Sequence, residues 1–175
     1  DVAVLDSAGR PLPPGETGMV EVRGPNVFKG YWRMPEKTAE ELRPDGFFIT
    51  GDLGRFDADG YLTIVGRQKD LIITGGFNVY PVEVEEAIDA LPGVLESAVV
   101  GVPHPDFGEG VLAVVVPRPG AAVDPAAVVA ALGARLAKFK LPKAVEVVAA
   151  LPRNTMGKVQ KAELRARYAA RFTGG

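Results

Sequence analysis

Short stretches in which apolar and polar residues alternate dominate the first third of the chain, and this spacing predicts strands. The stretches cover residues 2–5, 19–23, 48–56 and 61–65. One helix is predicted over residues 35–42, because Pro35 suits the first position of a helix and glutamate and alanine follow it. We therefore expect an antiparallel β subdomain over residues 1–68, with glycine and proline in the connecting turns.

After Gly66 the pattern changes to strands that alternate with helices. The apolar positions predict strands over residues 71–73, 97–102, 110–116 and 144–148. They predict a helix from Pro81 with a buried stripe ending at Leu91, a second over residues 125–137 capped by Asp124, and a third over residues 161–171. The second unit is thus predicted to be a small α+β domain with a mixed sheet and helices.

The composition describes a folded chain in which any metal site would have to rest on carboxylates. Its 175 residues are 47% hydrophobic, and no apolar run approaches the ~18 residues that would span a membrane. The first residues lack the pattern of a secretory signal, so we expect a cytoplasmic protein. The absence of cysteine and the single His104 exclude thiolate sites and polyhistidine metal sites.

Charge is unevenly distributed along the chain. The net charge is -2, yet residues 135–171 contain ten of the twenty Lys and Arg residues and only two acids, Glu146 and Glu163. This stretch is either a solvated helix face or a surface that meets anions. Nucleic acid is a poor fit, because aromatic residues are not interleaved with the basic ones, and phosphorylated small molecules fit better.

Two segments in the middle of the chain are candidate binding sites. In Thr50-Gly51-Asp52, a carboxylate held by a glycine turn can accept hydrogen bonds from a vicinal diol, although a plain turn is the simpler interpretation. Arg67, in Gly66-Arg67-Gln68-Lys69-Asp70, has the planar fork that binds phosphate or ribose oxygens. The pair Gly75-Gly76 allows close approach of backbone to a ligand, but it matches no nucleotide-binding pattern and an ordinary loop is the default.

Two further segments resemble known motifs without matching them. Lys158 follows a glycine in a polar turn, but a Walker phosphate loop would need glycine at Pro152 and serine or threonine at Val159. Asp106-Phe107-Gly108 matches a kinase magnesium motif, yet the other kinase motifs are missing and we interpret it as coincidence.

In this order and spacing, the segments together resemble the closing motifs of the adenylate-forming superfamily, which includes acyl-CoA synthetases. Gly30-Tyr31-Trp32 also resembles the motif at the end of that family's large domain. The resemblance implies that Asp52 and Arg67 contact the ribose of ATP or AMP. It implies that Lys158 is the catalytic residue that drives adenylation.

The same resemblance implies a C-terminal lid domain over residues 69–175. Lys69, with Asp70 beside it, would be the hinge, and Gly75 and Gly76 would line the pantetheine tunnel of CoA. The basic residues expected near the CoA nucleotide are Lys138, Lys140 and Lys143. Asn78 departs from the arginine that some acetyl-CoA synthetases place there, so that phosphate contact is not expected here.

The resemblance covers the whole chain, from the last β subdomain of the large domain to the end of the lid. It implies that the large N-terminal domain, with its phosphate loop and acid pocket, is missing, so that the fragment alone would be inactive. The implied cofactors are ATP, CoA and Mg²⁺, the last bound mainly by the missing domain. We expect no metal site in this chain.

The resemblance implies an AMP-forming acid:CoA ligase that acts on a small carboxylic acid and has a place in fatty acid metabolism. The segments look closest to bacterial malonyl-CoA synthetases, so malonate is the expected acid. Alternatives are an adenylation domain that serves a carrier protein and a non-catalytic accessory module that binds CoA. Acetylation of Lys158 would remove its charge, so a lysine acetyltransferase and a deacetylase are further expected partners, whereas nucleic acid and a membrane span are not.

Overall fold

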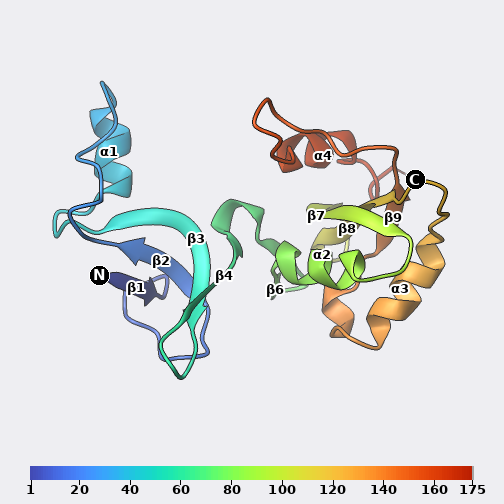
Figure 1. Cartoon of the computed structure of the whole chain (residues 1–175), viewed down its shortest axis with the longest axis horizontal. Coiled ribbons are helices and arrows are strands. Elements are labelled where there is room, and N and C mark those ends of the chain that lie inside the picture. The colour runs from blue at the N-terminus through green and yellow to red at the C-terminus, as the bar shows by residue number, and fades with distance from the viewer. Residues whose placement is uncertain (175) are drawn as a thin grey trace. The chain divides into compact units, whose positions relative to one another are not determined.

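The computed structural model describes residues 1–174, and it divides the chain into two compact units (Figure 1). The first unit is Asp1–Lys69 and the second begins at Asp70. Among residues 1–174, no helix is long and apolar enough to cross a membrane.

The first unit is a four-stranded antiparallel sheet in the order β1-β2-β3-β4. Its strands are β1 (Val2–Leu5), β2 (Gly18–Val22), β3 (Phe48–Phe56) and β4 (Leu62–Arg67). The helix α1 (Pro35–Glu41) lies between β2 and β3 and begins at its proline, as the sequence predicts. The predicted antiparallel β fold is therefore confirmed.

A charged pair lies inside this first unit. The Glu21 side chain on β2 is almost fully buried, and its two carboxylate oxygens accept hydrogen bonds from the Arg43 guanidinium at 2.6 and 2.7 Å. These hydrogen bonds raise the pKa of Arg43. The two parallel hydrogen bonds tie the segment after α1 to the middle of the sheet.

The second unit is built on a five-stranded mixed sheet in the order β6-β5-β8-β7, with β9 paired to β8. Its strands are β5 (Ile72–Thr74), β6 (Phe77–Val79), β7 (Val94–His104), β8 (Gly108–Pro117) and β9 (Ala144–Val147). Only the β8–β9 pairing is parallel. The helices are α2 (Pro81–Asp89), α3 (Pro125–Gly133) and α4 (Lys161–Arg167). A short 3₁₀ helix, η2 (Lys138–Lys140), lies between α3 and β9, and another, η1 (Gln68–Asp70), lies between β4 and β5 at the boundary of the two units.

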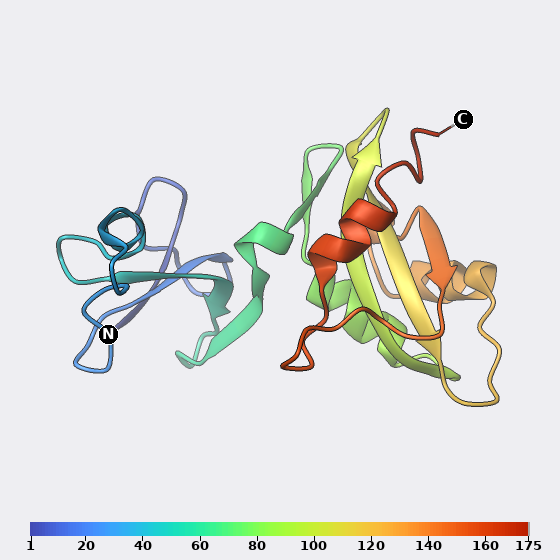
Figure 2. The same cartoon turned by 90° about the horizontal axis from the view of Figure 1, so that it is seen from above.

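Both faces of this sheet are covered, with α2 and α3 on one face and α4 on the other (Figures 1 and 2). Successive residues of β8 contribute to opposite cores, because side chains alternate along a strand. Val111, Ala113 and Val115 pack in the core with α2 and α3, and the other core, with α4, contains Leu112 and Val114. This arrangement confirms the predicted α+β class.

The helices end earlier than the sequence pattern suggests. The helix α3 ends at Gly133 and does not reach residue 137. Glycine is a poor helix former, which favours an end at this position. The predicted cap is confirmed, because the Asp124 carboxylate accepts from the backbone N–H groups of Ala126 and Ala127. After Arg167 the chain continues in hydrogen-bonded turns that bring the Phe172 ring to 5.1 Å from the His104 ring.

Candidate functional site

Strand β3 contains a bulge at the segment that the sequence singled out. Ile49 pairs with Glu21 and Leu53 pairs with Met19, so three residues of β3 lie opposite the single Val20. The Thr50 hydroxyl donates to the Val20 carbonyl at 2.7 Å and accepts from the Asp52 N–H at 3.0 Å. Gly51 has φ +73°, a conformation that favours glycine. A bulge re-aims the side chains beside it, here that of Asp52.

The structure brings Asp52 and Arg67 together. The two residues are directly paired between β3 and β4, and Arg67 Nε lies 2.8 Å from Asp52 Oδ1. Arg67 Nη1 also donates to the Thr50 carbonyl at 3.1 Å. The Asp52 carboxylate is therefore oriented by a cation whose own position is fixed by the bulge.

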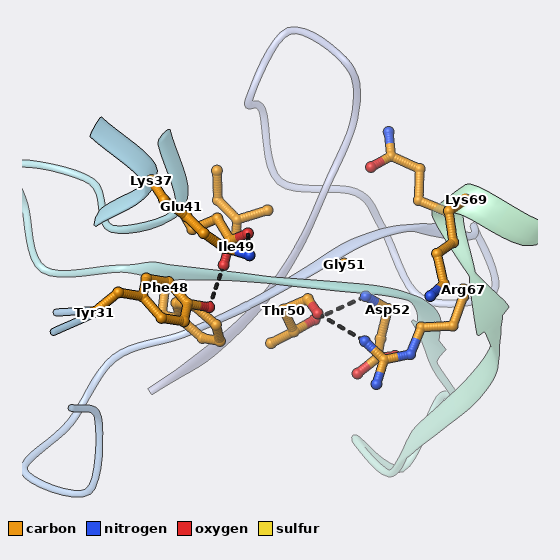
Figure 3. A pocket seen from close by; sticks show the side chains of 11 residues that line it. Tyr31, Lys37, Glu41, Phe48, Ile49, Thr50, Gly51, Asp52, Arg67 and Lys69 are labelled. Carbon is orange, nitrogen blue, oxygen red and sulfur yellow. Dashed lines mark hydrogen bonds and ion pairs between the residues drawn. The ribbon is translucent and has the colours of Figure 1, made fainter. Parts of the chain in front are cut away.

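These residues line a hollow of about 770 Å³ in the first unit (Figure 3). Figure 3 shows Asp52, Arg67 and Lys69 in one part of the hollow and Tyr31 with Glu41 in another. The Tyr31 hydroxyl donates to the Glu41 carboxylate at 2.5 Å, and this hydrogen bond raises the pKa of Tyr31. A concave surface that offers a carboxylate and cations suits a sugar diol next to a phosphate.

Gly75 and Gly76 form the two-residue turn of a hairpin between β5 and β6. Their φ values are +56° and +81°, as a type I′ turn requires, and the Gly75 N–H donates to the Phe107 carbonyl at 2.9 Å. An ordinary loop was predicted here, and β6 was not predicted. Two glycines between two apolar runs are the signal of a tight hairpin, so the hairpin could have been predicted from the sequence.

The hairpin lies beside η2. The Phe77 and Phe139 rings stack with their centroids 4.7 Å apart, and Phe77 is about half exposed. Lys138 is exposed, whereas Lys140 Nζ lies 2.6 Å from the Glu83 carboxylate. The structure thus brings the predicted CoA residues together, but it commits the Lys140 charge to a protein partner.

The third lysine expected near the CoA nucleotide also lies near the hairpin. Lys143 is exposed and its ammonium lies 4.7 Å from the centre of the Phe107 ring. A Cβ on Gly75 would lie 3.4 Å from the same ring. Its position within the basic stretch was visible in the sequence, but its proximity to the glycines depends on the β5–β8 pairing.

Lys158 lies in a tight loop ahead of α4. The Asn154 side-chain oxygen accepts from the N–H groups of Met156 and Lys158, and the Asn154 N–H donates to the Lys158 carbonyl. Gly157 has φ +76°, which completes the turn. The Lys158 side chain is exposed, and it forms no ion pair within residues 1–174. An exposed ammonium on a fixed loop can meet an anion that approaches from solvent.

The loop before α4 and the hairpin of β6 lie on different sides of the second unit in both views (Figures 1 and 2). The unit therefore presents two distinct surfaces. One carries Lys158 and the other carries Gly75 and Gly76.

Lys69 and Asp70, the predicted hinge, lie in η1, and the boundary between the two units falls between them. The Asp70 carboxylate lies 2.6 Å from Arg165 Nη2 on α4. Asp70 is thus anchored in the second unit, and the hinge assignment stays a prediction. Within residues 1–174, no group of three or more acidic or histidine side chains is placed to hold a metal ion.

Comparisons with known proteins agree on one family. Residues 83–158 match the model of the AMP-binding enzyme C-terminal domain. A feruloyl-CoA synthase from Amycolatopsis is 50% identical over 96% of this chain, and a sulfoacetate–CoA ligase from Cupriavidus necator is 46% identical over 92%. The structure of ATP-bound MatB from Rhodopseudomonas palustris superposes with a TM-score of 0.93 at 63% identity and covers 98% of this chain.

The chain spans about a third of the length of these relatives. It covers 34% of the feruloyl-CoA synthase, 32% of the sulfoacetate–CoA ligase and 34% of the MatB chain. An amide bond synthetase from Marinactinospora thermotolerans also superposes, with a TM-score of 0.91 at 42% identity, over 96% of this chain and 34% of its own.

Proposed function

Because this chain carries an AMP-binding enzyme C-terminal domain and belongs to the adenylate-forming enzymes, we propose that the whole protein is an ATP-dependent acid:CoA ligase. The relatives whose names state an activity include several CoA ligases, which supports CoA as the acceptor rather than a carrier protein. The observation that carries the proposal is the exposed Lys158 on its hydrogen-bonded loop.

In the first reaction, a carboxylate oxygen attacks the α-phosphorus of ATP, and the bond to the bridging oxygen breaks to release pyrophosphate. Negative charge builds up between the acid and the α-phosphorus during this step. The Lys158 ammonium, held in advance by its loop, stabilises that charge more in the transition state than in the ground state. A preorganised donor of this kind contributes roughly 3–4 kcal/mol, or about a hundred- to a thousandfold in rate.

Asp52 and Arg67 would hold the nucleotide during this step. The Asp52 carboxylate accepts hydrogen bonds from the ribose hydroxyls, and Arg67 keeps the carboxylate oriented through their 2.8 Å ion pair. Arg67 is about half exposed, so its remaining N–H groups can reach ribose oxygens. The open hollow around them leaves room for a sugar.

In the second reaction, the CoA sulfur attacks the carbonyl carbon of the acyl-adenylate, and the bond to the AMP oxygen breaks. The thiol must approach where Lys158 stood, so the second unit must turn its other surface to the reaction. Rotation at Lys69 would replace the Lys158 loop by the Gly75-Gly76 hairpin, past which a pantetheine arm can run because neither residue has a side chain. Lys138 and Lys143 would then meet the CoA phosphates.

Malonate is the acid that we propose. The support is the similarity to MatB, a malonyl-CoA synthetase: this chain is 61–64% identical to solved structures that contain MatB sequence. The acid pocket belongs to the other two thirds of such an enzyme, so the acid must be measured. Release of pyrophosphate by the full-length protein should be fastest with malonate in a panel that includes methylmalonate, acetate and longer acids.

Lys158→Ala tests the central assignment in the full-length protein. We expect pyrophosphate release to fall by about a hundredfold or more, because the transition state loses its ammonium, while CoA transfer from a supplied acyl-adenylate persists. Lys29→Ala, which removes an exposed lysine from the first unit, is the matched control and should change neither reaction. Equal loss of both reactions in Lys158→Ala would contradict the role.

A further inference from the structure

We infer that Arg153 is a positioning residue for the adenylation reaction, which it serves by fixing the loop that carries Lys158. This inference rests on the proposed role of Lys158. Arg153 forms a β-bridge with Val159, so it lies at the base of the loop. Its guanidinium makes contacts on two sides, one inside the loop and one to the sheet.

The contact inside the loop reaches the residue before Lys158. Arg153 Nη1 donates to the Gly157 carbonyl at 2.6 Å. The guanidinium therefore holds the peptide group that joins Gly157 to Lys158. Asn154 holds the opposite side of the turn through the N–H groups of Met156 and Lys158. These contacts restrict the Lys158 backbone on both sides, which leaves its motion to the side chain.

The contact outside the loop ties it to the sheet. Arg153 Nη2 forms an ion pair with the Glu96 carboxylate on β7, and Glu96 is partly buried. A planar guanidinium can satisfy both partners at once, because its N–H groups point in fixed, different directions. A lysine at this position would have one ammonium and could not reproduce that fork.

A second tie fixes the other end of the segment. Lys161, the first residue of α4, lies 2.7 Å from the Glu85 carboxylate on α2, and the same carboxylate oxygen accepts from the Val99 N–H of β7. Leu151 before the loop and Leu164 after it are buried in the core against β7 and β8. The loop is thus anchored at both ends, and Arg153 is the anchor that also holds the peptide group before Lys158.

This bracing matters for adenylation because transition-state stabilisation requires the donor to be placed in advance. A displacement of about 1 Å can reduce a rate by on the order of a hundredfold. The thioester reaction uses the other surface of the unit, so it should not depend on Arg153. The expected signature is therefore a split between the two half-reactions, which a loss of stability would not produce.

The test compares two arginines in full-length protein. Arg153→Met removes the ion pair to Glu96, and the matched control Arg171→Met removes the 2.6 Å ion pair to Glu146 in the same unit. The two pairs are similarly exposed: the arginine and glutamate side chains are 41% and 29% exposed in the Arg153–Glu96 pair, and 45% and 28% exposed in the Arg171–Glu146 pair. Each variant is assayed for pyrophosphate release at saturating ATP, for thioester formation from supplied acyl-adenylate, and for its melting temperature.

Arg153→Met is expected to slow pyrophosphate release by about 10- to 100-fold with thioester formation unchanged, whereas Arg171→Met should change neither. Glu96→Ala removes the partner on the sheet and keeps the arginine, so it should also slow pyrophosphate release without changing thioester formation. It replaces Arg153→Met in the test if that variant does not fold. Equal behaviour of Arg153→Met and Arg171→Met, or equal loss of both half-reactions in Arg153→Met, overturns the inference. If Lys158→Ala retains pyrophosphate release, the proposed function itself fails, and this outcome is distinct from the others.

Discussion

The bulge at Gly51 offers a direct test of how β3 prepares the nucleotide site. Gly51 has φ +73°, and a Cβ built on it would meet only Arg67 Nη1, at an ordinary contact distance of 3.8 Å. Gly51→Ala therefore adds a backbone cost without a steric clash. The variant weakens the one conformation in which Thr50, Asp52 and Arg67 hold one another.

The size of the effect follows from the backbone. The left-handed conformation costs a residue with a Cβ about 1–2 kcal/mol. The ratio of the bulged form to a relaxed form of the strand therefore falls by about 5- to 30-fold. When only the bulged form binds, apparent affinity falls by at most this factor, and by the whole of it when the relaxed form predominates in the variant and in the parent protein. We therefore expect Gly51→Ala to weaken ATP binding, with an upper limit of about 30-fold.

The measurement is titration calorimetry of ATP with the full-length protein. Gly60→Ala is the matched control, because Gly60 has φ +86° and a Cβ there would meet nothing within 4 Å, so the backbone cost is similar. Gly60 lies in the turn between β3 and β4, away from Asp52. Equal ATP affinity in the two variants would refute the reasoning that the bulge prepares the site.

Two further variants test the supports of the two units. Arg43→Met leaves the buried Glu21 carboxylate without its cation and should lower the free energy of unfolding by up to about 3 kcal/mol in urea titrations. Adding Glu21→Gln to the same chain should partly reverse this loss, because it removes the unpaired charge. Full stability of Arg43→Met would contradict the contribution of this pair. Phe139→Ala removes the stack on Phe77 and should raise the KM for CoA several-fold while pyrophosphate release is unchanged. An unchanged KM for CoA would show that the hairpin needs no such support.

The regular elements were predictable because their signals are local. The strands of β3 and β4 and the first turns of α1 and α2 follow from alternation and from prolines at first helical positions. The strand β6 was missed because its three residues, Phe77–Val79, follow a glycine pair that was interpreted as an open loop. A run this short carries little periodicity, and only the turn chemistry of Gly75-Gly76 revealed it.

The site was predictable in its residues but not in its contacts. Asp52 and Arg67 were named for separate reasons, and their pairing depends on the register of β3 and β4, which shifts between Leu53 and Gly54. Lys140 was expected at a CoA site, yet its ammonium pairs with Glu83, a residue far away in the sequence. Which cations stay exposed is decided by tertiary pairing, and composition alone does not reveal it.

The two surfaces of the second unit constrain how a single domain could serve two reactions. The Gly75-Gly76 turn is closed by its own backbone conformation and by the Phe107 carbonyl, and the Lys158 loop is closed by Asn154 and Arg153. Neither device leaves its segment free to move to the other surface. If both reactions occur, the exchange must therefore come from rotation of the whole unit, and the change in backbone angles must fall outside these segments. The boundary at Lys69 meets that requirement, because Asp70 is already tied to α4 through Arg165.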